Sequence, residues 1–173
     1  MTRNLTRLPP YGQDGSLHMI VESPRGSRVK IDFNPKYRIF EISRELPVGV
    51  AYPFDWGFIP GTVGEDGDPL DVMALHHQPT YPGVLLHCHV LGMVEVMQRE
   101  GKGRPEVNNR IIVTPAWSQA LGTLERASAI SKLARDQIEQ FFVAAVAFTG
   151  KTVDIRGWTG RRETDAFIRK HMG

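Results

Sequence analysis

Three aspartates, Asp66, Asp68 and Asp71, lie close together in the segment EDGDPLDV. In a uniform strand the first two would share a face and Asp71 would point away, because side chains alternate along a strand. Gly67 and Pro69 break that regularity, and both favour turns. A bend here would let all three carboxylates converge. The segment therefore predicts either a solvated acidic turn or a site for a hard cation.

The spacing and type of these residues restrict which metal ion the segment could bind. A calcium-binding EF-hand loop counted from Asp66 would place Leu70, Asp71 and His77 where that loop needs an oxygen ligand, a glycine and a glutamate, so this interpretation fails. Carboxylate ligands with few neutral carbonyl partners favour Mg²⁺ or Mn²⁺, which often bridge to substrate phosphates. The motif therefore indicates phosphate chemistry.

A phosphate substrate also needs cations that hold its oxygens. Lys30, Arg44 and Arg110 lie in or beside predicted strands, from which a small barrel could direct them inward. Each of these residues alone would be an ordinary surface residue. Their value as candidates depends on converging with the acidic segment at one mouth of the fold.

The elements that must position these residues follow from the sequence pattern. Between residues 17 and 115, short β-branched or aromatic runs alternate with Gly and Pro, which predicts a closed or curled antiparallel sheet, a small barrel more than a doubly wound fold. From Leu124 to Ala145, apolar residues recur at helical spacing, which predicts one long helix up to Gly150. TVDIRGW predicts a further strand and ETDAFIRKHM a second, short helix. The fold class is mainly β with flanking α-helices, and we expect one domain over residues 1–173.

Composition excludes several classes of protein. A formal net charge of +2 with scattered basic residues argues against a nucleic-acid partner. No apolar run approaches the length of a membrane span, and MTRNLTRLPPYG lacks the apolar stretch of a secretory signal. The single cysteine, Cys88, allows no internal disulfide. We therefore expect a cytoplasmic protein.

The histidines suggest a competing zinc site. His87 and His89 flank Cys88 on a predicted strand, with His76 and His77 upstream. Alternation puts His87 and His89 on one face and Cys88 on the other, so the three do not form a compact ligand set. We interpret these histidines as strand residues that face solvent or a subunit contact.

The segment YPFDWGFIPGTVGEDGDPLDV, residues 52–72, resembles the active-site segment of the family I soluble inorganic pyrophosphatases. The resemblance extends over most of the chain, from IVESP through RVKID and SRELPVGVAYP to QFFVAAV. It implies a five-stranded barrel of the oligonucleotide-binding type, Mg²⁺-dependent hydrolysis of pyrophosphate, with Mn²⁺ as an alternative metal, and a homo-oligomer, often a hexamer.

The resemblance also implies roles for individual residues. Asp66 and Asp71 would hold metal ions that activate a water, and Asp68 would take its proton. Glu22 would be a further metal ligand, and Asp32 also matches a family active-site position. The substrate-binding residues would be Lys30, Arg44, Tyr52, Trp56 and Arg110, of which Trp56 stands for a family tyrosine and Arg110 for a family lysine.

Four positions depart from the family pattern. Gln98 and Asn108 stand where two further aspartates are expected, and Ala145 and Val146 stand where the long helix should carry a tyrosine and a lysine. Losing two carboxylates leaves the repulsion between divalent cations less well offset, so fewer metals should bind. Glu100 or Glu106 could replace the missing charge. The departures leave two alternatives open: a relative that binds phosphate with little or no catalysis, and a hydrolase of a different phosphoanhydride.

Overall fold

The longest strand, β6 (Leu85–Glu100), organises the computed structural model, which describes residues 4–118 and 127–173. Its first half pairs with β1 (Leu17–Ser23) and β8 (Arg110–Pro115). A ring then closes through β4 (Asp55–Phe58) and β5 (Asp71–Ala74), in the order β1, β4, β5, β8, β6 and back to β1. All of these pairings are antiparallel except β5 with β8, which is parallel. The prediction of five strands that close on themselves is confirmed.

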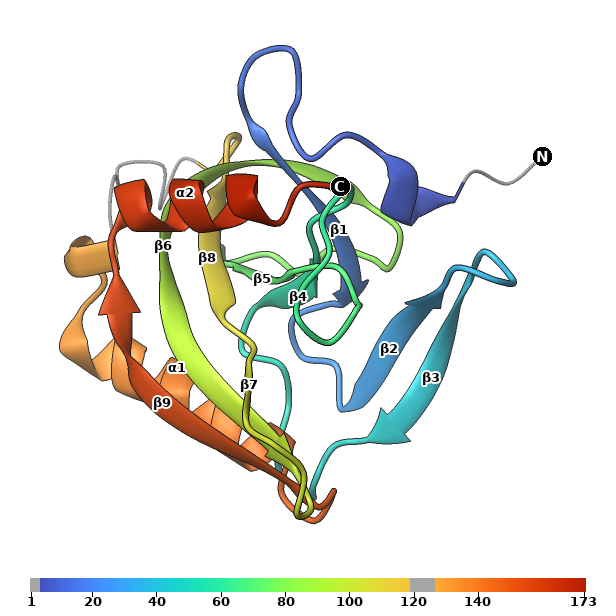
Figure 1. Cartoon of the computed structure of the whole chain (residues 1–173), viewed down its shortest axis with the longest axis vertical. Coiled ribbons are helices and arrows are strands. Elements are labelled where there is room, and N and C mark those ends of the chain that lie inside the picture. Colours follow the sequence, from blue (N-terminus) through green and yellow to red (C-terminus); the bar gives the residue numbers. More distant parts are fainter. Residues whose placement is uncertain (1–3, 119–126) are drawn as a thin grey trace.

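The second half of β6 runs beyond the ring. There it pairs with β9 (Lys151–Thr159) and with the two-residue strand β7 (Glu106–Val107). The hairpin of β2 (Val29–Asn34) and β3 (Ile39–Glu45) forms a separate two-stranded sheet, which stands to one side of the ring in Figure 1. Phe33 of this hairpin packs on Ile20 and Phe58, and this contact fixes the hairpin beside β1 and β4.

Two helices flank the sheet. Helix α1 (Lys132–Ala145) buries Ile138, Phe141 and Phe142 against one side of the ring, as its apolar spacing predicts. Helix α2 (Arg161–Lys170) buries Ile168 in a second cluster on β1, β5 and β8. Within the described residues, two short 3₁₀ segments lie at Leu5–Arg7 and Ala127–Ala129.

The predicted bounds of the long helix were wrong at both ends. The described helix begins after Ser131, whose side chain accepts a hydrogen bond from the Ala134 amide at 3.2 Å, a typical N-cap. It ends at Ala145, and turns occupy residues 146–150, with Phe148 at a φ of 65°. Leu124, where the predicted helix began, lies outside the described residues. The predicted strand and the predicted short helix that follow are both confirmed.

Candidate active site

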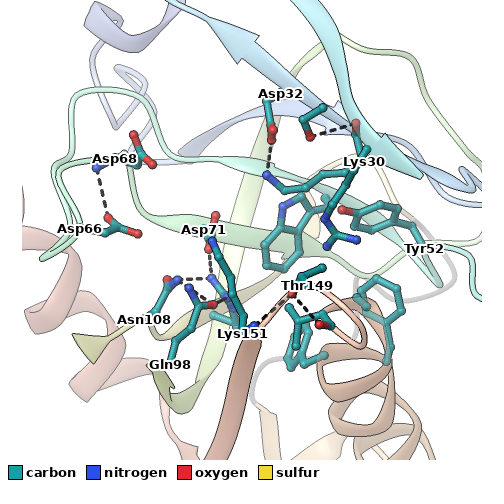
Figure 2. Close-up of a pocket in the computed structure, with 18 residues that line it drawn as sticks. Lys30, Asp32, Tyr52, Asp66, Asp68, Asp71, Gln98, Asn108, Thr149 and Lys151 are labelled. Carbon is teal, nitrogen blue, oxygen red and sulfur yellow. Dashed lines mark hydrogen bonds and ion pairs between the residues drawn. The ribbon is translucent and has the colours of Figure 1, made fainter. Parts of the chain in front are cut away.

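A cavity of about 360 Å³ lies between the β2–β3 hairpin, the loop that joins β4 to β5, the far end of β6 and the last turns of α1 (Figure 2). Charged side chains of both signs line it: Lys30, Asp32, Arg44, Asp66, Asp68, Asp71, Arg110 and Lys151. Tyr52, Trp56, Phe141 and Phe142 add aromatic walls. The cavity thus gathers segments that are far apart in the sequence, and it contains most of the residues that we predicted from it.

The acidic loop, residues 59–70, carries Asp66 and Asp68. Its turn is closed by the Gly64 amide, which donates to the Asp68 carbonyl oxygen at 2.7 Å, and Gly67 takes a φ of 86°, which glycine adopts without strain. The Asp68 amide donates to Asp66 Oδ1 at 3.1 Å (Figure 2). Partial removal from water and the nearby charge of Asp66 raise the pKa of Asp68 above its ordinary value. The loop therefore holds two carboxylates at close quarters, as a cation site requires.

Glu22 lies behind this loop. It sits at an irregularity of β1, where the register against β4 shifts between Val21 and Ser23, and such bulges redirect side chains. Glu22 Oε1 accepts a hydrogen bond from the Phe33 amide at 2.8 Å. Burial raises the pKa of Glu22 to about 7, with Asp32 and Asp68 adding to the rise. Glu22 is buried and is not among the residues that line the cavity, so it lies in the interior with its carboxylate bonded to the β2–β3 hairpin.

Strands β2 and β3 bring in two of the predicted cations. Lys30 and Arg44 are directly opposite each other in the hairpin. Lys30 Nζ lies 2.5 Å from Asp32 Oδ1, a partly exposed ion pair, and Arg44 Nη1 donates to the Glu45 carbonyl oxygen at 3.4 Å. Both side chains line the cavity, so the hairpin supplies positive charge on the side opposite the far end of β6.

Arg110 forms the most connected part of the site. Its buried guanidinium is ion-paired with Asp71, donates from Nη1 to Asn108 Oδ1 at 2.7 Å and donates from Nη2 to Gln98 Oε1 at 3.1 Å. The guanidinium also lies over the Trp56 ring, 5.2 Å from its centroid. We name Asp71, Gln98, Asn108 and Arg110 the arginine cluster; Figure 2 labels Asp71, Gln98 and Asn108. Burial lowers the pKa of Arg110 to about 10, so the group stays charged at neutral pH.

The aromatic wall explains how α1 meets the site. The Tyr52 ring lies 5.0 Å from that of Phe141, and the Trp56 ring lies 5.9 Å from that of Phe142. Burial raises the pKa of Tyr52 to about 12, so its phenol stays protonated and can donate a hydrogen bond. The core prediction for Phe141 and Phe142 is confirmed. Their rings pack directly on Tyr52 and Trp56, so the core and the cavity share this aromatic contact.

Sequence reasoning missed Lys151. This lysine begins β9 directly after the turn that ends at Gly150, and it lines the cavity beside Gln98 and Asn108 (Figure 2). Its Nζ lies 4.0 Å from Glu100 Oε2, a loose and partly exposed pair. Ala145 and Val146 line the same part of the cavity with apolar side chains. Lys151 lies between the predicted helix end at Gly150 and the predicted strand TVDIRGW, which begins at Thr152, and its position just past the helix end was the available signal.

The predicted substitutes for the missing carboxylates do not reach the cavity. Glu100 and Glu106 are exposed, and neither lines it. The zinc site is also absent from the described residues, where no three His, Cys, Asp or Glu side chains are placed to hold one metal ion. His87 and His89 are exposed and Cys88 is buried, as alternation predicted. The interpretation of His76 as a strand residue that faces solvent was wrong, because His76 follows β5 and is buried, with its Nε2 2.9 Å from Asp55 Oδ2.

The donors in the cavity fit a hard cation with few protein ligands. Asp66 and Asp68 offer only oxygen, and no ion pair between described residues includes either of them. Mg²⁺ commonly takes one or two carboxylates and keeps several waters. Asp71, the third predicted member of the set, is instead paired with Arg110 in this structure.

Within residues 4–118 and 127–173, none of the helices combines the length and apolar character needed to cross a membrane.

Comparison with known proteins agrees with the site. The sequence profile of the inorganic pyrophosphatase family matches residues 19–173. The inorganic pyrophosphatase of Thermus thermophilus is 34% identical over 164 residues, covering 91% of each chain, and that of Synechocystis is 32% identical over 165 residues, covering 95% of this chain and 93% of the relative.

Solved structures give the same result. The crystal structure of the Thermus thermophilus inorganic pyrophosphatase superposes with a TM-score of 0.90 at 32% identity, over 98% of this chain and 97% of the other. The Neisseria gonorrhoeae inorganic pyrophosphatase superposes with a TM-score of 0.84 at 32% identity, over 95% and 94% of the two chains. From its profile, its relatives and its fold, this chain belongs to the inorganic pyrophosphatase family.

Proposed function

We propose that this chain hydrolyses inorganic pyrophosphate to two orthophosphates with the help of Mg²⁺. One observation carries the proposal: in a chain of the pyrophosphatase family, the acidic loop lies in the same cavity as Lys30, Arg44, Arg110 and Lys151. Carboxylates suit a hard cation, and the four basic groups suit a polyanion. The comparisons lend no support to a relative without catalysis or to a different phosphoanhydride.

We assign the metal to the aspartates. Asp66 and Asp71 would supply ligand oxygens from the two ends of the motif, and Glu22 would support them from behind the loop. A bound Mg²⁺ supplies a water that ionises more readily and neutralises charge on the phosphates, with Mn²⁺ able to replace it. For Asp71 this role requires that its ion pair with Arg110 opens.

Asp68 would accept the proton of the attacking water. It belongs to no ion pair between described residues, and its raised pKa makes its carboxylate a better base than an ordinary aspartate. As the water oxygen bonds to one phosphorus, the bridging oxygen leaves with the other phosphate and the proton passes to Asp68. Lys30 and Arg44 would hold phosphate oxygens in line for this displacement.

The aromatic residues would orient the substrate. The protonated Tyr52 phenol can donate to a phosphate oxygen, and Trp56 supports the Arg110 guanidinium through its ring. Ala145 and Val146 offer no polar contact, and we assign to Lys151 the positive charge that this side of the cavity needs.

The decisive experiment measures orthophosphate released from pyrophosphate with Mg²⁺ by the wild type and by Asp68→Asn. Loss of a general base predicts a rate lower by about 10²- to 10⁴-fold. Asp14→Asn, on a turn outside the cavity, serves as the matched control and should keep the wild-type rate. Equal rates for the wild type and Asp68→Asn would remove the assignment of Asp68.

We further propose that the chain forms a homo-oligomer, with a hexamer as the form that the family resemblance suggests. Analytical ultracentrifugation of the purified chain tests this, since a single species at 19.4 kDa would contradict it.

A further inference from the structure

In the arginine cluster, the Arg110 guanidinium is ion-paired with Asp71, a carboxylate that would otherwise be free to bind a metal ion. Arg110 is 7% exposed, and its guanidinium neutralises Asp71 directly. The remaining described acceptors, on Gln98 and Asn108, are neutral amides. A divalent cation at Asp71 would therefore have to displace the guanidinium or lie beside a buried charge of the same sign, and such repulsion is strong away from water.

The donors of Arg110 are not all used. A guanidinium carries five N–H groups. In this cluster Nη1 pairs with Asp71 and donates to Asn108 Oδ1, and Nη2 donates to Gln98 Oε1. Two N–H groups, on Nε and Nη2, thus have no partner among the described contacts, while the side chain lines the cavity. An incoming phosphate could be bound before Asp71 is released.

We propose that Arg110 makes cation binding at Asp71 conditional on substrate. In the substrate-free protein the guanidinium holds Asp71, so a divalent cation binds at the acidic loop alone. Pyrophosphate offers more oxygens and more charge than one carboxylate, and planar guanidinium binds phosphate oxygens in pairs. It draws Arg110 onto itself, and Asp71 becomes free to ligate a further cation. The inference rests on the proposed function.

Gln98 and Asn108 make this exchange feasible. Because both are neutral, neither would hold the guanidinium as an aspartate would, and a departing Arg110 leaves no additional buried charge beside them. Their amide groups also bond to each other, with Asn108 Nδ2 3.4 Å from Gln98 Oε1, so both keep a partner when Arg110 moves. The Trp56 ring keeps the guanidinium close throughout.

The test is Mn²⁺ binding to the metal-free full chain, measured as free Mn²⁺ by electron paramagnetic resonance. In the absence of substrate, Asp66→Asn should weaken binding by about tenfold, whereas Asp71→Asn should change it less than about twofold. With imidodiphosphate as a non-hydrolysable probe, the wild type should bind one further Mn²⁺ per chain beyond that held by the probe in solution. Asp71→Asn should not bind this additional ion.

A charge variant provides the second arm. Arg110→Gln should bind the further Mn²⁺ without imidodiphosphate, because Asp71 is already free. Arg44→Gln is the matched control, since it removes a guanidinium from the same cavity that has no described carboxylate partner. In the absence of imidodiphosphate it should bind Mn²⁺ as the wild type does. Circular dichroism checks that each variant is folded, and if Arg110→Gln is not, the two aspartate variants decide the question.

Two results would overturn the inference. One is that Asp71→Asn weakens substrate-free Mn²⁺ binding as much as Asp66→Asn. The other is that Arg110→Gln and Arg44→Gln bind Mn²⁺ alike. Hydrolysis of pyrophosphate by the wild type is assayed on the same preparation. If the wild type hydrolyses pyrophosphate and either of these two results is found, the proposed function stands and only the dependence of cation binding at Asp71 on substrate is rejected.

Discussion

The acidic loop and the arginine cluster lie in one cavity but balance their charges differently. In the loop, neither Asp66 nor Asp68 belongs to an ion pair between described residues, and the pKa of Asp68 is raised. In the cluster, Asp71 has Arg110, and every described acceptor of Arg110 belongs to the protein itself. No described cation is ion-paired with the carboxylates of the loop, whereas Arg110 neutralises Asp71 in the cluster. The two regions of one cavity therefore differ in whether the protein itself supplies the balancing charge.

The strongest test of this difference is Arg110→Met. We expect a loss of about 3 kcal/mol in the free energy of unfolding, because Asp71 is left as an uncompensated and partly buried charge. Urea denaturation measures the loss. The double variant Asp71→Asn with Arg110→Met should recover most of it, since no unpaired charge remains.

Arg44→Met controls for the loss of any cavity arginine, and it should change stability by about 0.5 kcal/mol or less. If it costs as much as Arg110→Met, the cluster is not the neutralised unit described above.

The second test concerns pH. Folding raises the pKa of Glu22 from 4.5 to about 7. Between these values the folded protein keeps a proton that the unfolded chain has released, so stability falls as pH rises through this window. The metal-free protein should lose about 3 kcal/mol between pH 4.5 and 7, and Glu22→Gln should remove this dependence. Thermal or urea unfolding across that pH range measures it.

Two controls accompany the pH experiment. Glu45→Gln, at an exposed position on β3, should leave the pH dependence in place. Mg²⁺ should reduce it for the wild type by favouring the charged form of the acidic residues. A flat profile in the metal-free wild type would contradict the assignment of a raised pKa to the buried Glu22 carboxyl.

The smallest expected effect is at Lys151. Lys151→Gln should raise KM for pyrophosphate about tenfold, as expected for the loss of one charged hydrogen bond, and should change kcat much less. Lys102→Gln, in the loop between β6 and β7, removes the same charge outside the cavity and should leave KM unchanged. An unchanged KM for Lys151→Gln would show that the charge of Lys151 does not contribute to binding pyrophosphate.

These two regions were not equally predictable from sequence. The acidic motif is local, since Asp66 and Asp68 lie in one turn and Asp71 follows at the start of β5, so its chemistry follows from residue types and spacing. The sheet and the two flanking helices could also be predicted, from the alternation of apolar runs with Gly and Pro and from the helical spacing of apolar residues. The ends of α1 did not, because Ser131 and the turn after Ala145 act through caps and turns that apolar spacing does not encode.

The arginine cluster could not be assembled in advance. Its members come from β5, β6, β8 and the residue pair just before β8, and their meeting depends on the register in which β6 pairs with β7 and β8. The sequence showed Gln98 and Asn108 only as missing charges. It did not show that Arg110 uses both amides as acceptors, or that Asp71 would be its ion-pair partner.

The length of β6 has a consequence for how such enzymes can diverge. Its first part is built into the closed ring and is largely buried, whereas residues 97 to 100 extend past the ring and become progressively more exposed. Gln98 lies in that overhang, braced by β9 and β7. A change between a carboxylate and an amide at position 98 therefore alters the charge of the cavity and leaves the closed ring of strands intact.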